Sequence, residues 1–149
     1  MSERGSYTYE YPRPMVTADC VVVRQRAEVL LVRRGNEPYR GCWALPGGFM
    51  EMDEPIEHCA VRELNEETGL TVAEDNLRLI GIYSAPGRDP RGRTVTGAYL
   101  VTIDDNGEAV GEEPRAGDDA AEVRWWPLLE LPPLAFDHAE IIAAAKKLL

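Results

Sequence analysis

Residues 48–70 constrain the fold of this chain more strongly than any other stretch, because they specify one helix and both of its ends. An Asp-Glu-Pro sequence at 53–55 is typical of a helix start, with an acidic cap and a proline in the first turn. Gly69 is placed to adopt the left-handed conformation that ends many helices. The helix is therefore predicted to run from this start to Thr68.

Three carboxylates share one face of that helix. Glu63, Glu66 and Glu67 are three and four residues apart, so they span about 100° of the helix surface. Like charges at these spacings destabilise a helix by about 0.2–0.5 kcal/mol per pair. A divalent cation would reverse that cost, and oxygen ligands without histidine or cysteine indicate Mg²⁺ or Mn²⁺ rather than zinc. A solvated acidic face is the alternative.

The spacing across the whole segment favours the metal site. From Gly48 the sequence reads glycine, five residues, glutamate, seven residues, and then Arg-Glu-Leu-Asn-Glu-Glu-Thr-Gly-Leu. Seven fixed residue types at these spacings arise by chance on the order of 10⁻⁹ per start position. The pattern, preceded by Leu45-Pro46-Gly47, resembles the sequence box of the Nudix hydrolases. The order of the flanking strands and loops is similar to that family over most of the chain.

This resemblance implies a fold and a reaction. The expected fold class is α/β, an α/β/α sandwich with a central mixed β-sheet. It would be formed by a single Nudix domain over residues 1–149, in which residues 1–14 form an N-terminal arm or strand. The expected reaction is hydrolysis of a nucleoside diphosphate linked to another group. Two or more Mg²⁺ ions, or Mn²⁺ in their place, would activate a water without a covalent nucleophile.

The resemblance also assigns roles within the box. Arg62 is expected to pair with Glu54 and to orient the loop against the helix. Arg62 and Glu66 are catalytic candidates. The implied metal ligands are the backbone carbonyl of Gly47 and the carboxylates of Glu63, Glu66 and Glu67, of which Glu66 would bind directly or through a water.

Three further features are similar to the ADP-ribose pyrophosphatase branch of this family. Pro86 stands 16 positions after Leu70, residues 83–95 form a loop rich in arginine, proline and glycine, and residues 134–141 read Leu-Ala-Phe-Asp-His-Ala-Glu-Ile. The resemblance implies cleavage of ADP-ribose to AMP and ribose 5-phosphate. Arginine suits bidentate contact with a diphosphate, although an exposed basic turn is the alternative. The candidate substrate-binding residues are Arg88, Arg91, Pro86, Trp43 and Gly48.

The general base is expected in the loop before the last strand, where similar enzymes carry a carboxylate. Residues 104–122 hold eight acids against one base. Asp119 is the candidate and Glu122 the competitor. Many relatives have glutamate where this chain has Asp119, so the reach of the side chain is shorter and the choice between the two stays open.

The net charge of −10 is concentrated in two stretches, −6 in residues 48–70 and −7 in residues 104–122. A field of this sign opposes binding to long phosphate backbones and anionic lipid, so neither nucleic acid nor a membrane is expected as a partner. The three cysteines lack C-x-x-C spacing and no signal peptide is visible, which fits a cytoplasmic protein.

The expected partners are a small nucleotide substrate and a second copy of the chain. The resemblance implies a homodimer whose N-terminal arm crosses to the partner subunit. Tyr7, Tyr9 and Tyr11 alternate in that arm, as in a strand, and a row of cross-strand aromatics is the alternative interpretation. The two histidines, His58 and His138, are assigned no role in the site.

The other elements follow from runs of β-branched residues and from turn signals. Asp137 is predicted to cap a last helix, with Glu140 as its capping-box partner. Strands are predicted over residues 17–24, 29–34, 77–83, 94–103 and 123–127, and loops over residues 35–48, 84–93 and 106–121.

Two rival functions are weighed. One is a Nudix hydrolase of nucleoside triphosphates or other nucleotide sugars. The other is a non-catalytic, ADP-ribose-sensing Nudix domain, which would carry an added DNA-binding domain. Because the chain ends near the predicted last helix and its box is intact, catalysis is the expectation.

Overall fold

The computed structural model describes residues 5–103, 114–117 and 120–149, which form one mixed sheet with a helix on each face. The order of the main strands is β3-β2-β1-β6-β5, with β4 paired to β1 and β7 paired to β2. The elements are β1 (Met15–Arg24), β2 (Glu28–Arg34), β3 (Trp43–Ala44), β4 (Gly47–Phe49), α1 (Ile56–Thr68), the 3-10 turn η1 (Glu74–Asn76), β5 (Arg78–Tyr83), β6 (Thr94–Ile103), β7 (Ala120–Pro127) and α2 (His138–Lys146).

The centre of the sheet is the parallel pair of β1 and β6, which runs in register from Met15 opposite Thr94 to Arg24 opposite Ile103. Antiparallel strands flank this pair on both sides. A central parallel strand is buried on both faces, and this explains why β1 is almost continuously apolar. The predicted central mixed sheet is confirmed.

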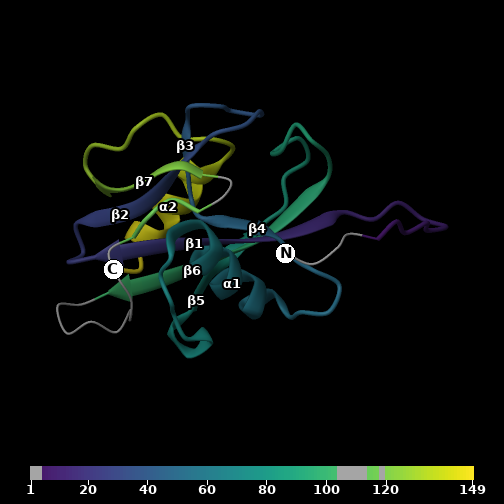
Figure 1. Cartoon of the computed structure of the whole chain (residues 1–149), viewed down its shortest axis with the longest axis horizontal. Helices are drawn as coiled ribbons and strands as arrows, with labels where there is room; N and C mark the ends of the chain where they lie inside the picture. Colours follow the sequence, from purple (N-terminus) through teal and green to yellow (C-terminus); the bar gives the residue numbers. More distant parts are fainter. Residues whose placement is uncertain (1–4, 104–113, 118–119) are drawn as a thin grey trace.

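Alternate residues of β1 supply two separate cores. Val21 and Val23 pack with Ile141 of α2, whereas Cys20 and Val22 pack with Leu64 of α1. Since successive strand residues point to opposite faces, α1 and α2 cover opposite faces of the sheet. Figure 1 shows the two helices, teal for α1 and yellow for α2, with the strands between them. This is the expected α/β/α sandwich.

Several boundaries differ from the sequence-based prediction. β1 begins two residues earlier than expected and β7 three residues earlier, because both are extended by pairing with neighbouring strands. The predicted loop at residues 35–48 contains the short strand β3 and the start of β4. The described part of the N-terminal arm, residues 5–14, pairs with no strand of the described chain and forms none itself.

The helix ends also differ in part. Gly69 ends α1 in the left-handed conformation, with φ of 80°, as predicted. The predicted acidic cap is wrong, because Pro55 is the N-cap residue and its side chain has no hydrogen-bonding group. The capping box of α2 is also wrong: Asp137 is the N-cap residue but makes no side-chain cap bond, since its carboxylate binds Arg88. No helix within the described ranges is long and apolar enough to cross a membrane.

Candidate functional site

Arg62 of α1 organises the acidic face of its helix. Its Nε and Nη2 donate to the two oxygens of Glu54 at 2.9 and 2.7 Å, which confirms the predicted pair. Its Nη1 donates to Glu63 at 2.8 Å and to Glu66 at 3.2 Å. Nη2 also donates to the carbonyl of Phe49 at 3.1 Å, so one guanidinium joins the loop before α1 to the helix.

The charges in this network alter one another's ionisation. The hydrogen bonds from Arg62 lower the pKa of Glu54, whose side chain is 5% exposed. The same bonds raise the pKa of the Arg62 guanidinium. Burial raises the pKa of Glu63, which Arg62 opposes without cancelling. A further positive charge nearby would therefore stabilise the ionised form of Glu63.

Two glycines bring the preceding turn against these carboxylates. The Gly47 N–H donates to Glu67 Oε1 at 2.9 Å. A Cβ on Gly48 would overlap the Glu63 carboxylate, so only glycine allows this approach. The structure thus places Gly47 and Gly48 of β4 beside Glu63 and Glu67, as the resemblance implied.

The donors gathered here are oxygens, which suit hard cations such as Mg²⁺ and Mn²⁺. Within the described ranges, no three acidic, histidine or cysteine side chains converge as in a formed metal site. Arg62 binds Glu63 and Glu66, while one oxygen of Glu67 accepts from Gly47. The residues fit a divalent cation in chemistry, and the carboxylates of Glu63 and Glu66 would have to rotate away from Arg62 to hold one.

The arginine-rich loop between β5 and β6, residues 84–93, is fixed by hydrogen bonds to other parts of the chain. Arg88 donates from Nε and Nη2 to Asp137 at 2.8 and 2.6 Å and from Nη1 to Thr96 at 2.6 Å, and its side chain is 5% exposed. These contacts indicate that Arg88 ties the loop to α2. Pro86 is exposed in the same loop.

Arg91 is more accessible, with 39% of its side chain exposed. It pairs with the buried Asp89, and its guanidinium lies 5.3 Å from the ring centre of Phe136. Arg34, which the sequence did not single out, lies 5.1 Å from the same ring. Burial, followed by the nearby charge of Arg91, lowers the pKa of Arg34, while Glu67 opposes this shift. Two positive charges therefore lie beside the Phe136 ring, and that of Arg34 is close enough to Glu67 of α1 to interact with it.

The other candidates are less central. Trp43 is 8% exposed and packs edge-on against Trp126, with ring centres 5.2 Å apart, which favours a role in the core. Glu122 is exposed on β7 opposite Arg33. Asp119 lies outside the described residues. The Gly117 N–H donates to the Glu67 carbonyl at 3.0 Å, so the described segment before Asp119 lies against the end of α1.

Sequence reasoning missed a buried pair beside the turn. His138 Nε2 lies 3.3 Å from Asp19 Oδ2, and a Cβ on Gly47 would overlap the other oxygen of Asp19. The available signal for Asp19 was a carboxylate between Ala18 and Cys20 in the interior of a largely apolar strand. Nothing local marks His138, because its partners are distant in sequence.

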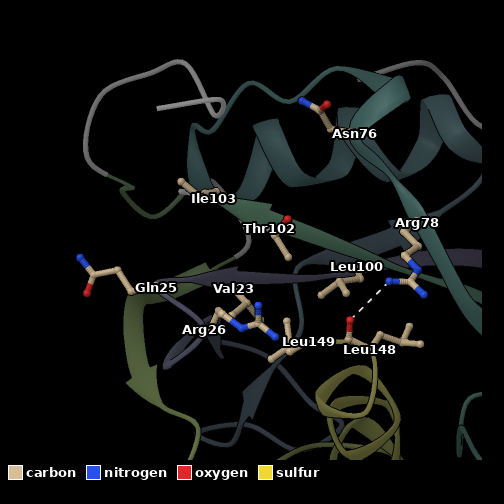
Figure 2. A pocket seen from close by; sticks show the side chains of 10 residues that line it. All are labelled: Val23, Gln25, Arg26, Asn76, Arg78, Leu100, Thr102, Ile103, Leu148 and Leu149. Atoms are coloured by element: carbon tan, nitrogen blue, oxygen red, sulfur yellow. Dashed lines mark hydrogen bonds between the residues drawn. The ribbon is translucent and has the colours of Figure 1, made fainter. Parts of the chain in front are cut away.

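A cavity of about 760 Å³ lies elsewhere, at the carboxyl end of β1. Figure 2 shows Arg26 and Arg78 beside it, with Arg78 donating to the Leu148 carbonyl at 3.3 Å. No carboxylate side chain is among the described residues that line it. Because it has no acidic side chain among these lining residues, this cavity is a weaker candidate for a divalent-cation site than the acidic face of α1.

Comparison with known proteins is consistent with this site. Residues 13–145 match the NUDIX domain family. The chain is 42% identical to an ADP-ribose pyrophosphatase of Methanocaldococcus jannaschii over 89% of its own length and 73% of the relative's.

Two solved structures are similar. One is a bifunctional NMN adenylyltransferase/ADP ribose pyrophosphatase of Francisella tularensis, complexed with AMP and a manganese ion. It has a TM-score of 0.78 and 31% identity, over 91% of this chain and 42% of that longer one. The other is the NUDIX domain of Shewanella oneidensis NrtR complexed with ADP ribose, with a TM-score of 0.80 and 30% identity over 92% of this chain and 89% of that one.

Proposed function

The chain belongs to the NUDIX family, and from that premise we propose that it hydrolyses the diphosphate bond of ADP-ribose, with Mg²⁺ or Mn²⁺, to AMP and ribose 5-phosphate. The observation that carries the proposal is the contact of Gly47 and Gly48, at the start of β4, with Glu67 and Glu63 of α1. The similarity to an archaeal ADP-ribose pyrophosphatase over most of both chains supports the substrate.

The residues of the turn and α1 would hold the metal. The proposed ligands are the carbonyl of Gly47 and the carboxylates of Glu63, Glu66 and Glu67. Bound divalent cations supply charge neutralisation of the diphosphate and a more acidic water. Arg62 keeps Glu54 and the loop in place, and its bonds to Glu63 and Glu66 would have to break for these two carboxylates to hold a cation.

Other residues would bind substrate and move the proton. Arg91, half-exposed beside Phe136, would contact the diphosphate or the terminal ribose. Gly48, which lies against the Glu63 carboxylate, is a further candidate substrate contact. Asp119 is proposed as the general base, with Glu122 as the alternative, because the segment that ends at Gly117 is bonded to α1 at Glu67.

A substrate profile tests this proposal. With Mg²⁺ present, kcat/KM should be highest for ADP-ribose among ADP-ribose, other nucleotide sugars, dinucleoside polyphosphates and nucleoside triphosphates. A much higher kcat/KM for a triphosphate would reject ADP-ribose as the substrate and leave the family assignment intact.

The second candidate is an ADP-ribose sensor, favoured by the likeness to a NUDIX domain whose solved structure contains ADP ribose. Calorimetry and product analysis on one preparation separate the two functions. Tight binding of ADP-ribose without cation-dependent release of AMP would support the sensor.

We further propose that the protein is a homodimer located in the cytoplasm. Tyr7, Tyr9 and Tyr11 are exposed in the described arm, where a second copy could cover them. Cys20, Cys42 and Cys59 are all free thiols, which suits a reducing compartment. Light scattering of the full chain and of a chain lacking residues 1–14 would show whether the arm sustains a dimer.

A further inference from the structure

The backbone of the turn at residues 45–47 is bonded to three different elements. The Cys20 N–H of β1 donates to the Pro46 carbonyl at 2.9 Å. The Gly47 N–H donates to Glu67 of α1 at 2.9 Å. The Leu45 N–H donates to His138 Nδ1 of α2 at 3.0 Å. The first two elements lie beside the site, whereas α2 belongs to the opposite face of the sheet.

The His138 ring fills the space between the turn and β1. The residue is 5% exposed. Its Nδ1 accepts from Leu45 and so carries no proton, which places the ring proton on Nε2, 3.3 Å from Asp19 Oδ2. Asp19 is paired in register with Gly47. The His138 imidazole therefore contacts both Leu45, the first residue of the turn, and the Asp19 carboxylate, which packs against Gly47, the third.

An apolar side chain of similar size could fill this space but could not accept from Leu45. Leu45 is 3% exposed, so its N–H would lose its acceptor in a place that water reaches poorly. The turn would then keep its hydrogen bonds to β1 and α1 and lose the hydrogen bond that fixes Leu45, its first residue. Displacement of the turn would move the backbone at Gly47, two residues further along.

We propose that His138 is a positioning residue for the metal site, acting through the bond from the Leu45 N–H to its Nδ1. It touches neither substrate nor metal. This inference rests on the proposed function, because it requires Gly47 to be a metal ligand. Residues that orient the ligands of a metal typically change its affinity by about 10- to 100-fold when they are replaced.

The test is Mn²⁺ affinity, measured by electron paramagnetic resonance on the full chain without substrate. In His138→Asn the side-chain oxygen stands near the position of Nδ1 and can accept from Leu45. In His138→Gln the amide stands near the position of Nε2 and reaches toward Asp19 instead. His138→Leu supplies neither group. Glu140→Gln is the matched control, since Glu140 is exposed on the same helix. A melting curve for each variant reports folding separately.

We expect His138→Asn and Glu140→Gln to bind Mn²⁺ within about twofold of the wild type, and His138→Gln and His138→Leu to bind at least about tenfold more weakly. If His138→Leu does not fold, the contrast between asparagine and glutamine decides. Equal Mn²⁺ affinity of the asparagine and glutamine variants, or wild-type affinity in a folded His138→Leu, would overturn this inference and leave the proposed function standing. Wild-type protein that does not bind Mn²⁺ would overturn the proposed function and this inference with it.

Discussion

At the scale of single residues, two adjacent glycines of the site have no room for a Cβ, and their neighbours differ. Beside Gly48 lies the end of the Glu63 side chain, which can rotate away. Beside Gly47 lies the Asp19 carboxylate, together with the backbone carbonyl of Ala18, which cannot move without the strand. The same substitution should therefore have different effects at the two positions.

We expect Gly48→Ala to keep the fold, with a loss of about 1 kcal/mol in the free energy of unfolding, and to weaken Mn²⁺ binding by about tenfold or more as Glu63 is displaced. Gly47→Ala should cost about 3 kcal/mol, because β4 must separate from β1. Urea unfolding and Mn²⁺ titration of both variants provide the check. Equal stability of the two variants would contradict the geometry.

The pair of Arg62 and Glu54 should contribute to stability in a pH-dependent way. The folded-state pKa of Glu54 lies below its unfolded value of about 4.3. The stabilisation is therefore complete above that pH and is lost as the pH falls through the folded pKa. We expect Glu54→Gln to lose about 2 kcal/mol at pH 7 and to show a weaker decline in stability below pH about 4. Parallel acid profiles for wild type and variant would contradict this assignment.

The choice of general base is also a question of single residues. Asp119→Asn should reduce kcat by about 10²-fold or more, whereas Glu122→Gln should have a smaller effect, since Glu122 is exposed on β7 opposite Arg33. Steady-state kinetics on ADP-ribose measures both variants. The reverse order would move the proposed base to Glu122.

At the scale of elements, local signals predicted α1 well and its surroundings less well. Both the course of α1 and its end at Gly69 follow from residues within the helix and next to it. The start of α2 was placed correctly, yet its cap was wrong, because Asp137 binds an arginine 49 residues away. An even larger separation, 93 residues, concealed the contact between Leu45 and His138. A local sequence pattern predicts a helix or strand, but it does not predict that a side chain such as Asp137 will bind a residue of a distant element.

The bond between Arg88 and Asp137 joins the β5–β6 loop to α2, and this structural role can be measured. Both side chains are largely buried, at 5% and 15% exposed. We expect Arg88→Ala and Asp137→Ala each to cost about 3 kcal/mol of stability, because each leaves the other charge without its partner. The double variant should cost little more than one single variant. Additive losses in denaturant unfolding would show that the two residues act independently, as they would if Arg88 served mainly to bind substrate.

At the scale of the whole molecule, the sheet order explains why the site forms where it does. The class of fold followed from the box and the strand pattern, but the pairing of β7 with β2 and of β4 with β1 depends on contacts between distant segments. Those pairings bring the turn to β1 and the segment before β7 to α1. One of the two acidic stretches, residues 48–70, is thereby arranged around Arg62. This stretch carries −6 of the chain's net charge of −10, which a bound cation would partly neutralise.

The most direct test of this account is the hydrolysis of ADP-ribose by wild type and by Glu67→Gln. The glutamine oxygen can still accept from the Gly47 N–H, so the variant should keep its fold and melting temperature. The account predicts that the wild type releases AMP and ribose 5-phosphate only when Mg²⁺ or Mn²⁺ is present, and that kcat of Glu67→Gln falls by several orders of magnitude. Near-normal turnover by the folded variant would contradict the assignment of α1 as the metal-binding helix.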